Sequence, residues 1–235
     1  MKLLILRPAV GAAATAERAR RLGHDGVIAP LFHYRALDWT PPTAPMPERI
    51  LLTSAAAARL GGPGLGWYRD IPVHAVGAAT AAAAWAVGFR TVTAGDTDVR
   101  TAIDLLAQQG VRHVLHLAGL DHVAIDHPLL LLERVKIYAA DAVAALPCDA
   151  LVALDAGAVA LLHSPRAAHV FRALLGGAGR TPARVQIACF SMAVAEAAGA
   201  GWAAVAVACR PTDDALFAAA ARLCDQGAHG VLEPR

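Results

Sequence analysis

The chain has 235 residues, of which 57% are hydrophobic and 17% are charged, and its formal net charge is +2. This composition excludes a disordered chain, and a nearly balanced charge without a basic stripe excludes a nucleic-acid binder. The N-terminal apolar run is cut at Arg7 and Pro8, and the most apolar late stretch, residues 193–208, is mostly Ala and Gly and contains Glu196. We therefore expect a cytoplasmic protein that binds neither nucleic acid nor a membrane.

The first third of the chain begins with one strand-helix-strand unit. Residues 2–6 form a short apolar run that predicts a buried strand, followed by an amphipathic helix over 11–22 and a second strand that ends at Pro30. The interval 38–48 is polar and rich in proline, so neither a helix nor a strand is expected there. The residues just before it, 32–36, are interpreted as a linker strand.

Strands and helices alternate through the rest of the chain. The predicted strands cover residues 49–53, 73–76, 90–93, 111–117, 134–139, 158–163, 185–189 and 203–207. The predicted helices begin at Ser54, Ala78, Val99, Asp149, Arg166, Met192 and Asp213. Such alternation is typical of parallel α/β sheets. The strand 134–139 alternates apolar and polar residues, and placed opposite 32–36 it would make a two-stranded connection.

Two parts of the chain resemble each other. The segment ILLTSAAAA at 50–58 matches VALLHSPRAA at 159–168. The segment VHAVGAATAAAA at 73–84 matches QIACFSMAVAEAA at 186–198. Internal duplication is the simplest explanation, so we predict two similar α/β halves whose strand-to-helix turns face a shared ligand cleft.

Small or hydroxyl residues follow the predicted strands. In parallel α/β sheets these turns gather at the carboxyl ends of the strands, where the free N–H groups of helix N-termini bind anions such as carboxylates or phosphates. The residues at these ends are Thr53, Ser54, Gly77, Ala118, Gly119, Ser164 and Ser191. The alternative for the three serines is a plain N-cap role, worth about 1 kcal/mol each.

The motifs of common catalytic and cofactor sites are absent. There is no GxSxG or HExxH, and His113 and His116, three apart on a predicted strand, point to opposite faces and cannot share a metal ion. The GGPGLG segment at 61–66 is interpreted as a loop and not as a dinucleotide fingerprint. The four cysteines form no CxxC pair, so we expect reduced, buried thiols. No metal and no nicotinamide cofactor are therefore expected.

Tyr138 lies on the predicted linker strand that would border the cleft. A phenol with an ordinary pKa near 10 remains a proton donor at neutral pH, so Tyr138 is a catalytic candidate. The alternative is a linker aromatic whose ring is packed and whose hydroxyl contacts water.

The ordered set of motifs resembles the uroporphyrinogen-III synthase family over nearly the whole chain. The matching segments are LRP at 6–8, LLTSAAA at 51–57, VGAATA at 76–81, HLAG at 116–119, VKIYAA at 135–140, LLHSP at 161–165 and IACFS at 187–191. The resemblance implies two α/β domains with a cleft between them, joined by a two-stranded linker. Their expected bounds are 1–32 with 142–235 for the discontinuous first domain, 36–137 for the second, and 32–36 with 134–141 for the linker strands.

The resemblance also implies an activity. The family's reaction is the cyclisation of hydroxymethylbilane, a small linear tetrapyrrole, with inversion of ring D and loss of water, on the route to heme, siroheme and cobalamin. It needs no cofactor, and a transient contact with the preceding pathway enzyme is expected. Tyr138 aligns with the family's linker tyrosine, which would assist departure of the hydroxyl group. The residues aligned with the turns that line the cleft are Thr53, Ser54, Gly77, Thr80, Ala118, Gly119, Ser164 and Ser191.

This chain departs from the family pattern at several positions. Gly119 is followed by Leu120, Asp121 and His122, where a basic residue is common, and Val194 stands where a threonine is common. These changes bear on affinity more than on fold. The runner-up function is a non-catalytic two-domain ligand-binding or regulatory protein with the same fold, since a fold alone does not fix a function.

Overall fold

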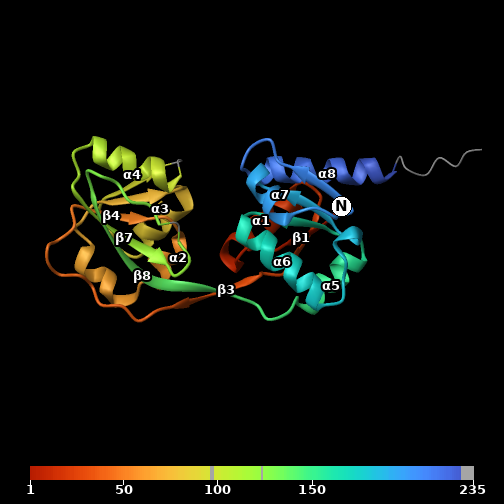
Figure 1. Ribbon diagram of the computed structural model, residues 1–235, viewed down its shortest axis with the longest axis horizontal. Coiled ribbons are helices and arrows are strands. Elements are labelled where there is room, and N and C mark those ends of the chain that lie inside the picture. The colour runs from red at the N-terminus through yellow and green to blue at the C-terminus, as the bar shows by residue number, and fades with distance from the viewer. Residues whose placement is uncertain (96–97, 123, 229–235) are drawn as a thin grey trace, which may run out of the picture. The chain divides into compact units, whose positions relative to one another are not determined.

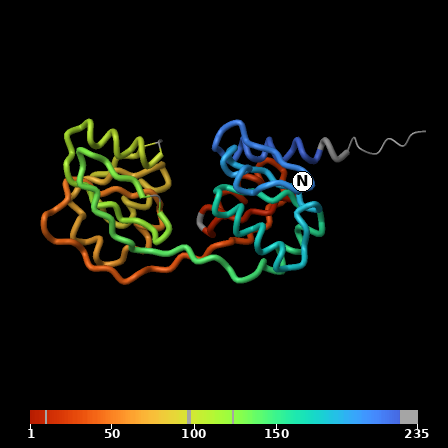
Figure 2. The backbone as a smooth tube through the Cα atoms, viewed as in Figure 1, coloured from red at the N-terminus to blue at the C-terminus, as the bar shows by residue number. Residues whose placement is uncertain are grey.

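The computed structural model describes residues 1–95, 98–122 and 124–228, and these form two compact units. Unit 1 contains Met1–His33 and the chain from Ala142 onward, whereas unit 2 contains the continuous segment Tyr34–Asp141. In Figure 1 the colour runs from red at the N-terminus to blue at the C-terminus, so unit 1 contains both the first and the last colours. Figure 2 shows that the chain enters and leaves unit 2 along two neighbouring segments.

Over the described residues, unit 1 contains a five-stranded sheet with the order β11-β10-β9-β1-β2 and parallel pairing throughout. Its strands are β1 (Lys2–Ile5), β2 (Asp25–Ile28), β9 (Val159–Leu162), β10 (Gln186–Cys189) and β11 (Ala204–Val207). Its helices are α1 (Ala9–Arg21), α5 (Cys148–Asp155), α6 (Pro165–Gly177), the short 3-10 helix η2 (Pro182–Arg184), α7 (Met192–Ala198) and α8 (Asp213–Ala228). Leu3, Leu4 and Ile5 are fully buried, and because successive strand side chains point to opposite faces, both faces of this sheet are covered.

Unit 2, in its described part, contains a six-stranded sheet with the order β3-β8-β7-β4-β5-β6. Its strands are β3 (Phe32–Ala36), which begins at the boundary with unit 1, β4 (Arg49–Leu52), β5 (Val73–Val76), β6 (Val92–Gly95), β7 (His113–Gly119) and β8 (Leu131–Ala142). Its helices are α2 (Ala55–Leu60), the 3-10 helix η1 (Gly62–Tyr68), α3 (Ala78–Ala86) and α4 (Val99–Gln108). The α/β class with parallel sheets is thus confirmed.

The same strand order occurs in both units. Read from one edge, β6-β5-β4-β7-β8 in unit 2 corresponds to β11-β10-β9-β1-β2 in unit 1. The correspondence matches the repeated sequence segments, which fall on β4 and β9 and on β5 and β10. It places the turns after β4 and β9 at equivalent positions in the two sheets.

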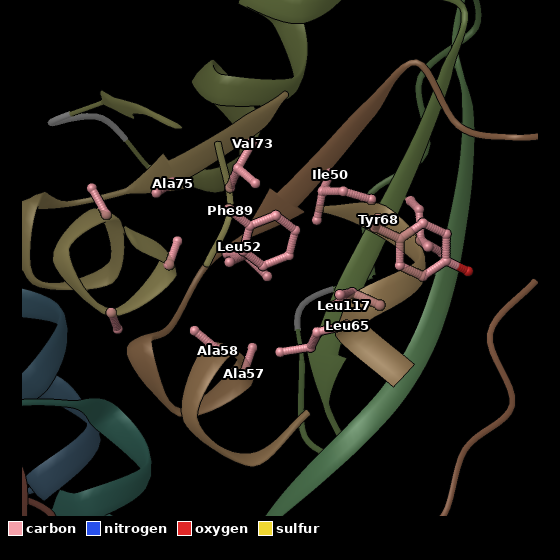
Figure 3. Packing of buried hydrophobic residues seen from close by; sticks show 14 of the residues in the cluster. Ile50, Leu52, Ala57, Ala58, Leu65, Tyr68, Val73, Ala75, Phe89 and Leu117 are labelled. Carbon is pink, nitrogen blue, oxygen red and sulfur yellow. The ribbon is translucent and has the colours of Figure 1, made fainter. Parts of the chain in front are cut away.

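In the core of unit 2, side chains of the central strand β4 pack against helices on both faces of the sheet. Ile50 and Leu52 on β4 pack with residues of α2 and α3, as Figure 3 shows for the labelled side chains. Leu51, between them in sequence, packs instead with Ile103 and Leu106 of α4. The alternation of side chains along a strand therefore explains why a continuous apolar run, and not an alternating one, forms this central strand.

Some details differ from the sequence-based expectations. Residues 62–66 of the GGPGLG segment do not form a loop but belong to the 3-10 helix η1. A Cβ at Gly64 would lie only 2.7 Å from the ring of Trp39, so glycine there allows close packing of the indole. The prediction of buried thiols is wrong for Cys148, Cys209 and Cys224, which are exposed, while Cys189 is buried. Exposure could not be inferred because these cysteines lie at helix and loop positions without clear periodicity. None of the helices in the described ranges combines the length and apolarity that a bilayer span needs.

The predicted linker strand 134–139 is longer than expected and has two neighbours. In the structure β8 runs from Leu131 to Ala142, lies beside β3 as expected, and also pairs in parallel with β7. The N–H of Leu37, just after β3, donates to the carbonyl of Ile137 at 3.0 Å. Residues of the linker strand are therefore part of the unit 2 sheet.

Candidate functional site

A pocket of about 220 Å³ lies at the carboxyl edge of the unit 2 sheet. Residues from β7, β8 and the segments that follow β4, β6 and β7 contribute to it. The lining residues are Thr53, Val99, His116, Gly119, Asp121, His122 and Tyr138. The position agrees with the rule that ligands of parallel α/β sheets bind beyond the carboxyl ends of the strands.

A β-bulge shapes the floor of this pocket. The register between β7 and β8 shifts between Ala118 and Gly119, so that Gly119 pairs with Tyr138. The Leu120 N–H donates to the Tyr138 carbonyl at 2.8 Å and continues the pairing past the end of β7. Bulges redirect side chains and occur often beside functional sites. Here the bulge brings the phenol of Tyr138 over the Cα of Gly119.

Gly119 makes room for the Tyr138 ring. A Cβ at position 119 would lie 2.8 Å from Cζ and 2.9 Å from the hydroxyl oxygen of Tyr138. We expect Gly119→Ala to destabilise the protein by about 1–3 kcal/mol through overpacking, because the Tyr138 ring must move. Urea unfolding measures this effect. Gly66→Ala is the matched control, since no atom lies within 4 Å of a Cβ there, and equal stability of the two variants would contradict the packing argument.

Two neighbouring side chains act on Tyr138. Its ring meets that of Tyr34 edge to face with centroids 5.7 Å apart, and the Ser54 hydroxyl influences the pKa of its phenol. Burial raises the pKa of Tyr138 above its ordinary value, and the hydrogen bond to Ser54 offsets part of that rise. Tyr138 is thus half-buried, protonated at neutral pH and part of the pocket lining.

His116 is buried and belongs to the same lining as Tyr138. Its Nε2 is 3.2 Å from the Thr53 hydroxyl oxygen, and its ring meets that of His122 edge to face. Burial, together with the smaller effects of the charges of His122 and Arg134, lowers the pKa of His116 to about 4. The imidazole is therefore neutral at physiological pH and orients the Thr53 hydroxyl by a hydrogen bond.

The structure brings only part of the predicted set into this pocket. Thr53, Gly119 and Tyr138 line it, whereas Ser54 does not line it and only influences the pKa of Tyr138. Gly77 begins α3 with a φ of 87°, a conformation that favours glycine, while Thr80 and Ala118 are buried in unit 2 outside the lining. Ser164 and Ser191 belong to unit 1, where they precede α6 and α7.

The serines at the helix starts differ in their capping. Ser54 accepts a hydrogen bond from the Ala56 N–H and Ser164 accepts one from the Ala167 N–H, whereas the Ser191 side chain makes no capping bond. We expect Ser164→Ala to lower the free energy of unfolding by about 1 kcal/mol, because one helix N–H loses its partner. Ser191→Ala is the matched control and should be close to neutral in the same urea titration. A neutral Ser164→Ala would rule out the capping contribution.

Several lining residues were missed by the motif analysis. Asp121 and His122 were noted only as departures from the family pattern, His116 was considered only as a metal ligand, and Val99 was not considered. His122 is fixed by its Nδ1, 2.9 Å from the Gly119 carbonyl oxygen. The spacing HLAGLDH, in which two polar residues follow a strand end by two and three positions, is the signal that could have identified them.

A larger cavity of about 600 Å³ lies in unit 1, but it is at the amino-terminal ends of β9 and β10. Asp155, Arg180 and Arg184 are among its lining residues, and Arg180 forms an ion pair with Asp155. None of the residues predicted from sequence lines it. The smaller pocket of unit 2 is therefore the better candidate, because it combines the carboxyl-edge position with converging hydroxyl and imidazole groups.

A comparison with protein families identifies the chain. The family model described as Uroporphyrinogen-III synthase HemD matches residues 13–218. The chain belongs to the uroporphyrinogen-III synthase family. The resemblance seen in the motifs is thereby confirmed, and the protein is an enzyme of porphyrin biosynthesis, a lyase.

Solved structures resemble the chain at low identity. A mutant selenomethionine derivative of uroporphyrinogen III synthase from Thermus thermophilus is 15% identical, and the match covers 96% of this chain and 99% of the solved one with a TM-score of 0.48. The wild-type enzyme of the same bacterium in a second crystal form is 17% identical, with coverage of 97% and 99% and a TM-score of 0.38. No curated protein sequence matches this chain.

Proposed function

We propose that this enzyme cyclises hydroxymethylbilane to uroporphyrinogen III with inversion of ring D, and that the unit 2 pocket is where the hydroxyl group departs. The observation that carries the proposal is the convergence of the Tyr138 phenol and the Thr53 hydroxyl, with a neutral His116 behind it, in one pocket. These groups donate and accept protons without carrying charge. They suit loss of water from an uncharged hydroxymethyl group.

The proposed chemistry begins at the hydroxymethyl group of ring A. Tyr138 donates its proton to the departing oxygen, the C–O bond breaks, and water leaves behind an azafulvenium-like cation. The substituted carbon of ring D then attacks this cation to give a spiro intermediate, which rearranges to the inverted macrocycle. The final loss of a proton from ring D balances the one donated by Tyr138. The main task of the protein is to hold ring D so that this carbon is the one that reacts.

The turns that follow the strands are proposed to bind the carboxylates of the substrate. In unit 2 this role falls to the backbone at Gly77, Ala118 and Gly119 and to the Thr80 hydroxyl. In unit 1 it falls to the turns at Ser164 and Ser191. At Gly77, Ser164 and Ser191 a helix follows, and its free amides favour carboxylates by their partial positive charge. The capping bonds of Ser54 and Ser164 support a structural role for these two hydroxyls, which leaves the backbone as the binding group.

The reactivity of the substrate suggests how it reaches the enzyme. Without assistance, hydroxymethylbilane closes to the unrotated isomer, so substrate that stays free in solution is converted to the wrong product. We propose that it is taken up in the cytoplasm through a transient contact with the enzyme that makes it, and that neither nucleic acid nor a membrane takes part.

One assay tests the proposed activity. Freshly made hydroxymethylbilane is supplied to the purified protein, the products are oxidised, and the isomers are separated by chromatography. The type III isomer is expected. Accumulation of the type I isomer alone, at the rate of the reaction without protein, would favour the non-catalytic binding protein of the same fold.

A further inference from the structure

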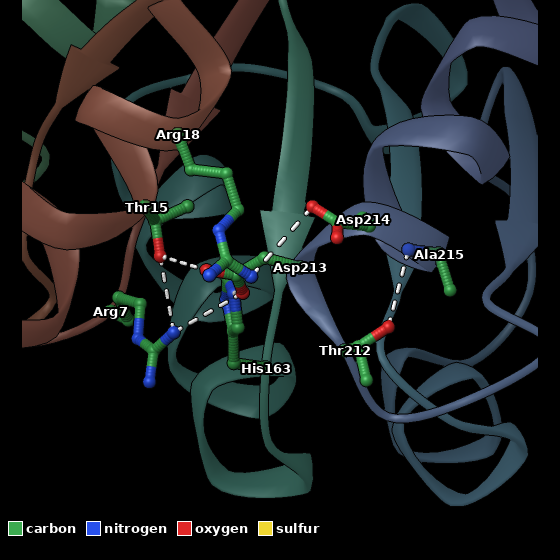
Figure 4. Close-up of polar contacts among 8 residues, drawn as sticks. All are labelled: Arg7, Thr15, Arg18, His163, Thr212, Asp213, Asp214 and Ala215. Carbon is green, nitrogen blue, oxygen red and sulfur yellow. Dashed lines mark hydrogen bonds and ion pairs between the residues drawn. The ribbon is translucent and has the colours of Figure 1, made fainter. Parts of the chain in front are cut away.

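Four polar side chains meet at the carboxyl edge of the unit 1 sheet (Figure 4). Arg7 follows β1, His163 follows β9, Asp213 begins α8 and Thr15 lies on α1. Three contacts converge on the Asp213 carboxylate: Thr15 Oγ1 donates to Oδ2 at 2.8 Å, Arg7 Nη1 donates to Oδ1 at 3.3 Å, and His163 Nε2 lies 3.4 Å from Oδ1. Asp213, which lies 206 positions after Arg7 in the sequence, thus helps to hold the Arg7 guanidinium in place.

Arg7 uses only one of its nitrogens in this cluster. Nη1 donates to Thr15 at 3.1 Å and to Asp213, whereas Nε and Nη2 make no hydrogen bond within the described part of the chain. Nε and Nη2 form the edge of a guanidinium that binds a carboxylate through two parallel hydrogen bonds. In Figure 4 the dashed lines from Arg7 to Thr15 and Asp213 start from the same guanidinium nitrogen. The Arg7 side chain is 33% exposed, so it is accessible from solvent.

The free edge of Arg7 lies against the first turn of α1, at Gly11. A Cβ at position 11 would come 2.6 Å from Nε and 3.1 Å from Nη2 of Arg7, so a side chain there would occupy the space beside this edge. The first turn of α1 contains no acidic residue, and no side chain caps the helix at Pro8. The first N–H groups of the helix therefore add partial positive charge at the same place.

The role of Asp213 in this cluster is to hold the Arg7 guanidinium. Burial alone would raise the pKa of Asp213, but hydrogen bonds from His163 and Thr15 and the charge of Arg7 outweigh it and lower the pKa. Asp213 therefore stays ionised and keeps its hold on Nη1. Since its charge offsets that of Arg7, attraction for an anion comes from the geometry of the free edge and the adjoining helix end.

We propose that Arg7 binds a carboxylate of the substrate through Nε and Nη2, and that Asp213 and Thr15 are positioning residues that hold its guanidinium. The identity of this ligand, a polycarboxylate tetrapyrrole, rests on the proposed function. Unit 1 then supplies a fixed two-point carboxylate site in addition to the backbone turns at Ser164 and Ser191.

The test measures binding without turnover. Uroporphyrin III, the oxidised product with all carboxylates retained, is titrated into the full-length protein and its fluorescence gives Kd. Arg7→Gln and Gly11→Ala should each raise Kd by about tenfold or more, because a charge-assisted bidentate contact is lost. Gly11→Ala is the sharper variant. Alanine favours a helix, but its Cβ displaces the Arg7 guanidinium, so Tm is measured alongside Kd to show that the variant is folded.

Two matched controls accompany these variants. Gly176→Ala makes the same substitution within α6, where no atom lies within 4 Å of a Cβ, and Arg18→Gln removes the neighbouring guanidinium that pairs with Asp214 at 3.7 Å. Both should bind as the wild type does. For the positioning role, Thr15→Val should weaken binding and Thr15→Ser should restore it, since the restored hydroxyl again holds Nη1.

The outcomes separate this inference from the activity. If Gly11→Ala binds uroporphyrin III as tightly as the wild type does, the Arg7 site is contradicted, even where Arg7→Gln fails to fold. The Arg7 site is also contradicted if the wild-type protein does not bind uroporphyrin III. A protein that makes the type III isomer but binds equally well in all variants keeps the proposed function and loses the Arg7 site. A protein that makes only the type I isomer loses the proposed function, whatever the binding result.

Discussion

Replacing Tyr138 by phenylalanine is expected to lower the turnover rate for uroporphyrinogen III by about a hundredfold, the lower range for loss of a general acid. The phenol is the protonated donor of the pocket, because burial raises the pKa of Tyr138 above its ordinary value. The variant keeps the ring that packs on Gly119, so the substrate should bind with little change. Steady-state rates with hydroxymethylbilane, together with the isomer ratio, measure the effect.

Tyr34→Phe is the matched control for this prediction. The two rings contact each other edge to face, but Tyr34 does not line the pocket, so its variant should retain nearly full turnover. If Tyr138→Phe turns over as fast as the wild type, Tyr138 acts through packing alone. A fall of the same size in both variants would point to distortion of the aromatic pair.

The buried neutral imidazole of His116 is expected to make the protein sensitive to acid. Its pKa is about 4 in the folded protein and about 6.5 when unfolded, so between these values the unfolded chain binds a proton that the folded chain does not. The free energy of unfolding should therefore rise with pH across this window. Conversely, about 3 kcal/mol should be lost as the pH falls from 6.5 to 4.

The contribution of His116 is isolated by difference. Burial also lowers the pKa of His24 and His74, which act in the same direction, so the wild-type slope alone is not diagnostic. His116→Gln keeps a hydrogen-bonding group near Thr53 but cannot titrate, and urea unfolding between pH 4 and 7 should give a flatter profile. His169→Gln, at an exposed position of α6, is the control substitution. Identical profiles for His116→Gln and the wild type would contradict the prediction.

Much of the fold could be predicted because its apolar runs are short and clearly separated. Strands such as β5 and the start of α3 at Ala78 were located to the residue, since a short segment bounded by two valines ends at a glycine there. The length of β8 was underestimated. Leu131 and Leu132 are followed by the charged residues Glu133 and Arg134. Because such residues do not indicate a strand locally, the pairing of this part of β8 with β7 could not be predicted from the sequence.

The candidate site was harder to predict than the fold. Thr53 and Gly119 follow predicted strands, and their position at the carboxyl edge follows from the parallel topology. The pairing of Gly119 with Tyr138 depends on a bulge, which shifts the register by one residue and has no sequence signature. The role of His116 depends on burial and on the distance to Thr53, and both are properties of the folded chain.

The order of the strands also has a consequence for the growing chain. β1 lies between β2 and β9 in its sheet, and Leu3 pairs with Val159. The N-terminal strand therefore cannot complete its pairing until more than half of the polypeptide has been synthesised. Tyr34–Asp141, by contrast, is a continuous segment with its own core, so it can fold as a unit during translation. The pocket with Tyr138 would then form on the ribosome before the sheet that holds Arg7.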